Sequence, residues 1–232
     1  MAMMGKGAVV IWADLGSLEQ AAHDDWHSHE HLPERIGIPG FLRGRRAVSV
    51  DGSAPQIMAI YELDDLSTLT SPAYLERLNN PTPWSARIMA AVKQLSRTLC
   101  RVTATHGGGL GAHHLTLAVS PEEGQAGALR GWLIDSVLPK LSSLPGITGA
   151  HLLEREPSVE PPLTEEQRLR PRRDVQVDVV ILVEGYDRAT LDALATTTLA
   201  PAVLIKHGAA GPAAVGRWSL AHVMVSDELA PR

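Results

Sequence analysis

The sequence contains an internal repeat, which restricts the folds that the chain can adopt. When the numbering is shifted by 106 residues, the apolar run 9–13 falls on the apolar run 115–119 without a gap. The same shift aligns Trp26 with Trp132, Leu32-Pro33 with Leu138-Pro139, and Pro39-Gly40 with Pro145-Gly146. Self-similarity at a fixed period indicates that one structural unit is present twice. We therefore expect two copies of the same small fold.

Each copy has the pattern of a strand, a helix, two strands, a helix and a closing strand. The third strand, 57–62, aligns with 179–184 at a shift of 122, so the second copy has gained 16 residues. This β-α-β-β-α-β order is the ferredoxin-like arrangement, and it predicts an α+β fold. We expect a first repeat over residues 1–106, a glycine-rich linker over 107–111 and a second repeat over 112–232.

The 16 additional residues fall within 156–174, a proline-rich and charged stretch. Such a composition offers little apolar surface to bury. We expect an exposed, mobile extension of a hairpin.

Composition restricts the partners of the chain. A net charge of −5 and a pI near 6.0 give no electrostatic reason to expect nucleic acid or an anionic membrane. The single cysteine, Cys100, excludes an intrachain disulfide and a thiolate metal site. No apolar run reaches the length of a membrane span. We expect a cytoplasmic protein with a small-molecule substrate.

Histidines are concentrated in the first predicted helix. His23, His27 and His31 share one face at about 100° per residue, while His29 points elsewhere. Their counterparts in the second copy are apolar: Leu129, Leu133 and Val137. Since an apolar helix face lies on its sheet, the three histidines are predicted to point inward.

Imidazoles on an inward face need hydrogen bonds, water or a cavity. Pro33 should bend or end the helix beside His31, which would open this position to a ligand. We predict His31 as a general acid or base and His27 as the residue that orients it or the substrate. His23 and Glu30 would bind the substrate. The alternative is that the histidines are satisfied residues of the core.

A metal site is a second alternative, because His27 and His31 have the spacing of two ligands on one helix face. The sequence indicates no third ligand, so we expect no metal and no other cofactor. A metal-dependent lyase that uses His27 and His31 stays open.

Other side chains could complete a pocket. Trp12, Tyr61 and Trp84 could line its apolar part, although buried aromatic residues usually belong to the core. Among the arginines of the second strand, Arg46 is a candidate for binding a substrate carboxylate, and a solvated edge is the alternative.

The first half resembles a known superfamily through Trp26, the run His31-Leu32-Pro33-Glu34-Arg35 and the turn Pro39-Gly40-Phe41. It is similar to the dimeric α/β-barrel superfamily, and within it to the EthD-like proteins of ethyl tert-butyl ether degradation. The resemblance implies that the antiparallel sheets of the two units pack into a single-chain barrel, with ligands between each sheet and its helices. The two-repeat chain could also form a homodimer.

Relatives in that superfamily include cofactor-independent monooxygenases, isomerases and haem-dependent enzymes, so the fold does not fix the reaction. The histidine of the motif corresponds to His31, and the second copy has Val137 there. We expect a cofactor-independent lyase, isomerase or monooxygenase that acts on a small, largely apolar or aromatic metabolite. A non-catalytic protein that binds a small ligand is the alternative from another class.

Overall fold

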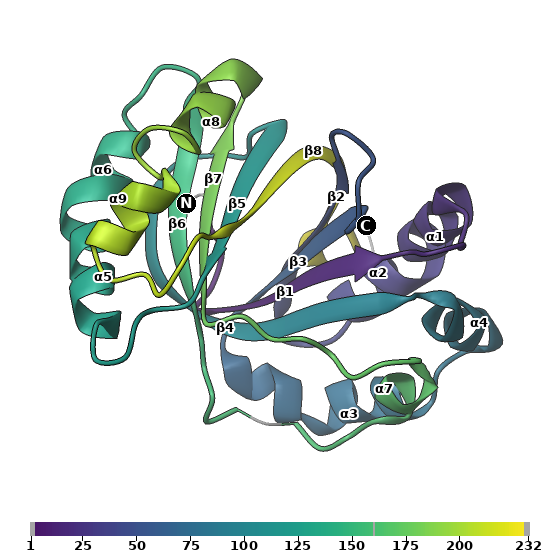
Figure 1. Ribbon diagram of the computed structural model, residues 1–232. Helices are drawn as coiled ribbons and strands as arrows, with labels where there is room; N and C mark the ends of the chain where they lie inside the picture. Colours follow the sequence, from purple (N-terminus) through teal and green to yellow (C-terminus); the bar gives the residue numbers. More distant parts are fainter. Residues whose placement is uncertain (1–2, 160, 230–232) are drawn as a thin grey trace. The chain divides into compact units, whose positions relative to one another are not determined.

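The computed structural model describes residues 3–159 and 161–229 (Figure 1). The strands found there hydrogen-bond in the cyclic order β1-β3-β2-β8-β5-β7-β6-β4, which closes a barrel, and the pairs β1–β3, β2–β3, β5–β7, β5–β8 and β6–β7 are antiparallel. Their bounds are β1 (Gly7–Asp14), β2 (Phe41–Ser49), β3 (Ile57–Leu63), β4 (Gln94–Gly107), β5 (His113–Val119), β6 (Ile147–Arg155), β7 (Val179–Gly185) and β8 (Ala214–Val225). The predicted α+β class, a ferredoxin-like α/β barrel of the dimeric type, is confirmed.

Helices connect the strands in both halves. They are α1 (Gln20–Trp26), η1 (His27–His31), α2 (Leu32–Ile36), η2 (Leu66–Thr70), α3 (Pro72–Asn79), α4 (Pro83–Ala91), α5 (Ala126–Trp132), η3 (Leu133–Val137), α6 (Leu138–Leu141), α7 (Glu165–Leu169), α8 (Arg188–Leu194), α9 (Pro201–Lys206) and η4 (Ser226–Leu229). None of the helices in the described residues has the length and hydropathy of a bilayer-crossing segment.

Equivalent strands pair in the same register in the two halves. In β1 and β3, Gly7 pairs with Leu63, and in β5 and β7 the corresponding pair is His113 with Gly185. The pairing of β2 with β3 and the pairing of β6 with β7 are also irregular at equivalent positions. The irregularity lies between Phe41 and Arg43 in β2 and between Ile147 and Gly149 in β6. The shifts of 106 and 122 found in the sequence therefore relate residues with equivalent backbone positions.

The contacts divide the chain into two compact units. The N-terminal unit comprises the described residues of Met4–Cys100, Glu156–Gln176 and Ala221–Arg232. The C-terminal unit comprises those of Met1–Met3, Arg101–Arg155 and Val177–Leu220. This grouping differs from the repeat boundaries expected from the sequence, 1–106 and 112–232, because β4 and β8 each contribute to both units. The repeat boundaries stay a prediction.

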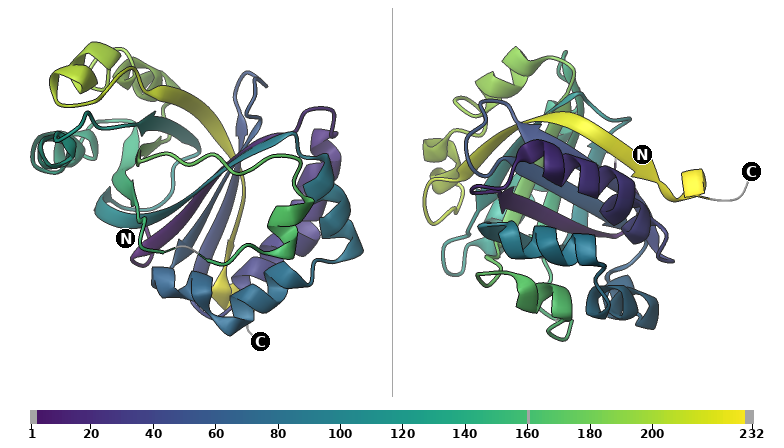
Figure 2. Two further views of the ribbon diagram at one scale, coloured as in Figure 1. Left: turned by 60° about the horizontal axis from the view of Figure 1, so that its bottom comes forward. Right: turned by 90° about the vertical axis from the view of Figure 1, so that its right-hand side faces the viewer.

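The inserted segment belongs to the N-terminal unit, although it lies within the second repeat. Its helix α7 contacts α3 and α4 (Figures 1 and 2). Thr164 and Glu166 are buried, and Thr164 begins the helix with a capping box that Gln167 completes. The expectation of an exposed extension is therefore wrong for this part of the segment, because charged side chains are buried when they find a partner.

The first helical run does not end at Pro33. It continues from α1 through a π-helical turn, η1, into α2, and the N–H of Leu32 donates to the carbonyl of His27, five residues back. The second half has the same turn at Leu133–Val137, directly before α6. The expected break is therefore a widened turn, which keeps His31 inside a continuous helical segment.

Candidate active site

The three histidines of one helix face are buried in the N-terminal unit. His23, His27 and His31 are 4%, 3% and 6% exposed. They line a cavity with about 470 Å³ of empty space, open solvent included. We call it the apolar cavity, and its lining is Ile11, Ala13, His23, Trp26, His27, His31, Ile57, Ala59, Tyr61, Met89, Val92, Leu95 and Arg170. The three side chains therefore face a partly enclosed space.

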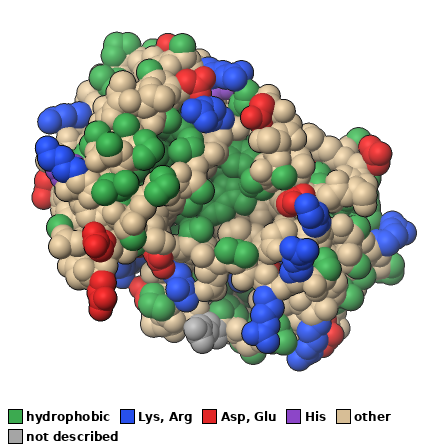
Figure 3. Space-filling view, in the orientation of Figure 1, with side chains coloured by type: hydrophobic (Ala, Val, Ile, Leu, Met, Phe, Trp, Pro, Cys, Tyr) green, Lys and Arg blue, Asp and Glu red, His purple; other side chains and the backbone are tan. Residues whose placement is uncertain are grey.

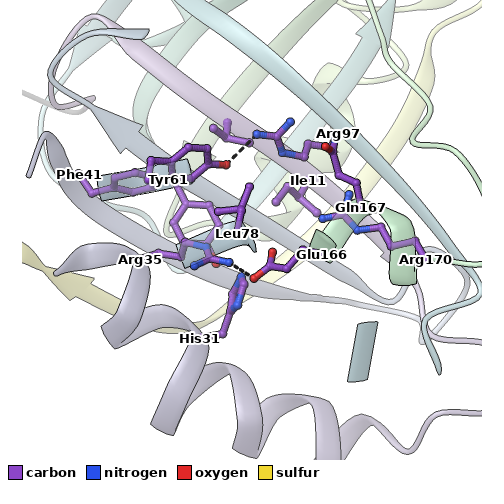
Figure 4. A pocket seen from close by; sticks show the side chains of 12 residues that line it. Ile11, His31, Arg35, Phe41, Tyr61, Leu78, Arg97, Glu166, Gln167 and Arg170 are labelled. Carbon is purple, nitrogen blue, oxygen red and sulfur yellow. Dashed lines mark hydrogen bonds and ion pairs between the residues drawn. The ribbon is translucent and has the colours of Figure 1, made fainter. Parts of the chain in front are cut away.

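A second space of about 390 Å³ of empty space, open solvent included, adjoins the first. This polar cavity is lined by Val9, Ile11, His31, Arg35, Phe41, Tyr61, Tyr74, Leu78, Arg97, Glu166, Gln167 and Arg170. His31, Tyr61 and Arg170 belong to both linings. Figure 4 shows His31 beside the ion pair of Arg35 and Glu166. His31 therefore stands between an apolar and a polar compartment.

Hydrogen bonds fix part of this site. His27 Nε2 lies 3.0 Å from the hydroxyl oxygen of Tyr61. Trp26 stacks on His31 with ring centroids 4.4 Å apart, and its Nε1 donates to Ser85 Oγ at 3.0 Å. The Nδ1 atoms of His27 and His31 are buried and have no hydrogen-bond partner among the described residues. The His31 ring is thus held by packing, and its Nδ1 atom has no partner among the described residues.

Burial controls the charge of these groups. Removal from water lowers the pKa of both His27 and His31 well below the usual range, and neighbouring cationic groups lower it further. Burial also raises the pKa of Tyr61, so its hydroxyl stays protonated. Both imidazoles are therefore neutral at neutral pH, which is the form that accepts a proton.

The polar cavity contains a buried ion pair. Arg35, from α2, pairs with Glu166, from α7, and its Nη1 lies 3.4 Å from a carboxylate oxygen of Glu34. Although burial opposes the charged form of Arg35, the charge of Glu166 raises the pKa of the guanidinium. The pair connects the inserted segment to the helix that follows the histidines.

Four of the residues predicted to bind a substrate line neither cavity. Glu30 accepts hydrogen bonds from Thr82 Oγ1 at 2.5 Å and Ser85 Oγ at 2.9 Å. Its carboxylate therefore ties η1 to the start of α4. Trp84, on the same helix, packs against a hydrophobic cluster of the unit. Both residues therefore lie outside the two cavities, and their contact with a substrate stays a prediction.

Trp12 and Arg46 also lie outside both cavities. Trp12 is buried on the face of β1 opposite to Ile11 and Ala13, because side chains alternate along a strand. Arg46 Nη1 donates to the backbone carbonyl of Asp24 at 2.9 Å and to Ser28 Oγ at 2.9 Å. Arg46 therefore connects β2 to α1 and η1 by hydrogen bonds, and it lies outside both cavities.

The described residues include no group of three or more His, Cys, Asp or Glu side chains that could hold a metal ion. His27 Nε2 is already engaged by Tyr61. The pair His27 and His31 thus lacks the further ligand that a protein metal site would need.

The sequence did not indicate three other charged residues of the cavities. Glu166 and Arg170 lie in the inserted segment, and Arg97 lies in β4. Nothing local in the sequence distinguishes them from surface charges. The position of the segment within the N-terminal unit brings Glu166 and Arg170 to His31.

No protein-family model matches the chain, and no curated protein matches its sequence. Solved structures share its fold. One is an anthrone oxidase-like protein, with a TM-score of 0.66 and 11% identity over 97% of this chain and 96% of that one. A candidate monooxygenase from Lactobacillus acidophilus NCFM has a TM-score of 0.53 and 9% identity over 95% of this chain and 97% of that one. Another candidate monooxygenase, from Fusobacterium nucleatum, has a TM-score of 0.52 and 10% identity over 96% of this chain and 96% of that one.

Proposed function

We propose that the protein is a cofactor-independent enzyme that removes a proton from a small, largely apolar or aromatic metabolite. His31 is the general base, and His27 orients the reacting group together with Tyr61. The observation that carries this proposal is the position of a neutral, buried His31 between the apolar and the polar cavity. A base in such a place can accept a proton from a bound carbon acid at neutral pH.

The rest of the site supports the same reaction. The apolar cavity offers aliphatic side chains and Trp26 to the body of a substrate. His27 and Tyr61 place a hydrogen-bonded pair beside the base, where negative charge would develop on a substrate oxygen. Both groups are uncharged, and a donor of this pair that is not used in their mutual hydrogen bond would stabilise the developing anion.

Proton removal is the first step shared by the three reaction types that the sequence leaves open. The resulting carbanion can be protonated at another carbon, can expel a leaving group, or can reduce O₂ directly. In the last case one oxygen atom becomes the product carbonyl and the other leaves as water. The fold neighbours described as oxidase-like or monooxygenase proteins favour the oxygen-dependent outcome as the first to be examined.

The proposal is tested with anthrone, an aromatic carbon acid, in deuterium oxide without oxygen. Wild-type protein should accelerate exchange of the acidic C–H hydrogen, measured by mass spectrometry, and should form a carbonyl product when O₂ is admitted. His31→Ala should lower the exchange rate by roughly 10²–10⁴-fold. His29→Ala is the control, because His29 is exposed and lies outside both cavities. Full activity of His31→Ala would refute the assignment.

The test also separates the alternative classes. Binding of anthrone by calorimetry without exchange or product would favour a ligand-binding protein. Stoichiometric zinc, iron, nickel or manganese in the purified protein would favour the metal-dependent alternative.

We further infer that the chain is a tandem duplication of an EthD-like unit. The equal strand registers and the equivalent π turns of the two halves support it. In this view the second copy lost, or never had, the histidine face, since Leu129, Leu133 and Val137 fill the corresponding positions in a hydrophobic core.

A further inference from the structure

A buried guanidinium without a counter-ion lies in the polar cavity. Arg97, on β4, is 8% exposed, and its Nη2 donates to the hydroxyl of Tyr74 at 2.9 Å. Among the described residues it has no other side-chain hydrogen bond and no ion pair. A buried cation is costly unless an anion compensates it. Its guanidinium therefore has a neutral hydroxyl and no carboxylate as its side-chain partner among the described residues.

Other buried arginines of the same unit have carboxylate partners. Arg35 pairs with Glu166, and Arg43 Nη2 lies 2.8 Å from Glu62 Oε2. Arg46 Nε lies 3.3 Å from Asp24 Oδ1. Arg97 differs from them although it is buried to a similar degree. The missing counter-charge is thus specific to the place where the two cavities meet the inserted segment.

Arg170 adds a second cation at this place. Its side chain is 7% exposed, and its Nη1 lies 2.5 Å from Asp174 Oδ2. The Nε atom is buried and has no hydrogen-bond partner among the described residues. Figure 4 shows Arg97 and Arg170 extending from the same side of the cavity. The single carboxylate of Asp174 does not compensate both guanidinium groups.

The surface next to these two residues is basic. A cavity of about 1160 Å³ of empty space, open solvent included, is lined by Arg97, Leu163, Gln167, Arg168, Arg170, Pro171, Arg172, Arg173, Asp174 and Gln176. In Figure 3 basic side chains gather toward the lower right, where Figure 1 draws α7. Five arginines line it against one aspartate, and although Arg168 also pairs with Glu165, the excess of positive charge attracts anions. This basic cavity shares Arg97 and Arg170 with the polar cavity, so it leads to the site.

We infer that Arg97 and Arg170 form an anion-binding subsite, and that the substrate carries a carboxylate on its apolar or aromatic body. The carboxylate binds in the polar cavity, the body occupies the apolar cavity, and the reacting carbon lies at His31 between them. A guanidinium group binds a carboxylate through two parallel hydrogen bonds, which fixes orientation as well as affinity. This inference rests on the proposed function, because it takes the two cavities as the substrate site.

Two pairs of probes test the subsite by calorimetry: benzoate against benzamide, and 1-naphthoate against 1-naphthamide. Each pair has nearly the same shape and differs in charge. Wild-type protein should bind the carboxylate of at least one pair roughly tenfold more tightly than the amide. Arg97→Gln and Arg170→Gln should each remove most of this preference. Arg87→Gln is the matched control, because Arg87 is an exposed arginine of the same unit that lines neither cavity, and the preference should persist.

Two more variants exclude a purely structural effect. Tyr74→Phe removes the hydrogen bond of Arg97 but keeps its charge, so the preference should survive. Arg97→Lys should retain part of it, since a lysine supplies the charge without the paired donors. Equal binding of acid and amide by the wild type, or no binding of any probe, would overturn the inference. So would an unchanged preference in both Arg97→Gln and Arg170→Gln.

The failure of the subsite and the failure of the proposed function are distinguishable. His31→Ala should keep the carboxylate preference while it loses proton exchange. A wild type that prefers carboxylates but catalyses no exchange retains the subsite and loses the enzymatic proposal. A wild type that catalyses exchange without a carboxylate preference retains the enzymatic proposal and loses the subsite.

Discussion

Arg35 on α2 and Glu166 on α7 form a buried ion pair, although 131 residues separate them in the sequence. The pair joins the inserted segment of the second repeat to the helical run that carries the three histidines. A substitution at Glu166 should therefore affect both the stability of the unit and the order of the segment.

Glu166→Ala should lower the free energy of unfolding by about 3 kcal/mol, because removal of one partner leaves a buried charge with only Glu34 nearby. Urea denaturation measures the change. Trypsin should also cleave the variant faster after the arginines of 168–173. Glu165→Ala is the control, since Glu165 is exposed and pairs only with Arg168 at the surface. Equal effects of the two substitutions would contradict the role of the pair.

The two buried imidazoles should make stability depend on pH. Their pKa values in the folded protein lie well below 6.5, so between these values and about 6.5 the unfolded chain binds protons that the folded chain does not. The free energy of unfolding is then highest above this range. It should fall as the pH decreases below about 6.5, by about 1.4 kcal/mol per pH unit for each histidine.

Urea denaturation at several pH values between 7.5 and 5 measures this slope. His31→Asn should reduce it by the share of one histidine, and the exposed His29→Asn should leave it unchanged. A slope that is the same in wild type and His31→Asn would show that folding does not lower the pKa of His31.

Tyr61→Phe should both destabilise the protein and slow the reaction. Loss of the hydroxyl leaves the buried Nε2 of His27 without its partner, which should cost about 1–3 kcal/mol. Proton exchange should slow because His27 is no longer held in one orientation. Tyr186→Phe is the control: this tyrosine is exposed, and its hydroxyl accepts only the backbone N–H of Gly146. Thermal unfolding and the exchange assay together check the prediction.

Gly44 permits a close approach of α2 to β2. A Cβ atom at this position would lie 2.3 Å from Leu32 Cδ1, next to His31 in the chain. Gly44→Ala should therefore destabilise the protein by about 1–3 kcal/mol and reduce activity, because the packed side chains of Leu32 and Ile36 must shift. Gly127→Ala is the contrast: a Cβ there meets nothing within 4 Å on α5, so stability should rise by about 0.5–1 kcal/mol. Destabilisation by Gly127→Ala and none by Gly44→Ala would contradict this account of the packing.

The sequence predicted the fold class because the repeat aligns whole elements, and the registers of β1 with β3 and β5 with β7 follow the same shifts. It did not predict the partner of Arg35, because nothing local in residues 156–174 signals a contact 131 residues away. It left Trp12 open between the pocket and the core, and the structure places it in the core. The run 9–13 is apolar on both faces of its strand, so its pattern cannot tell which side chains meet the helices.

The π turn sets the angular position of the histidines. A hydrogen bond from Leu32 to His27 encloses one residue more than an α-helical turn does. A chain shortened by one residue between them would return to ordinary α geometry and rotate His23 by about 100° relative to α2. The sequence would still contain all three histidines, but their side chains would no longer line the same cavity. The proposed catalytic arrangement therefore depends on the length of the backbone as well as on the identity of its side chains, and the second half keeps this length where no histidine requires it.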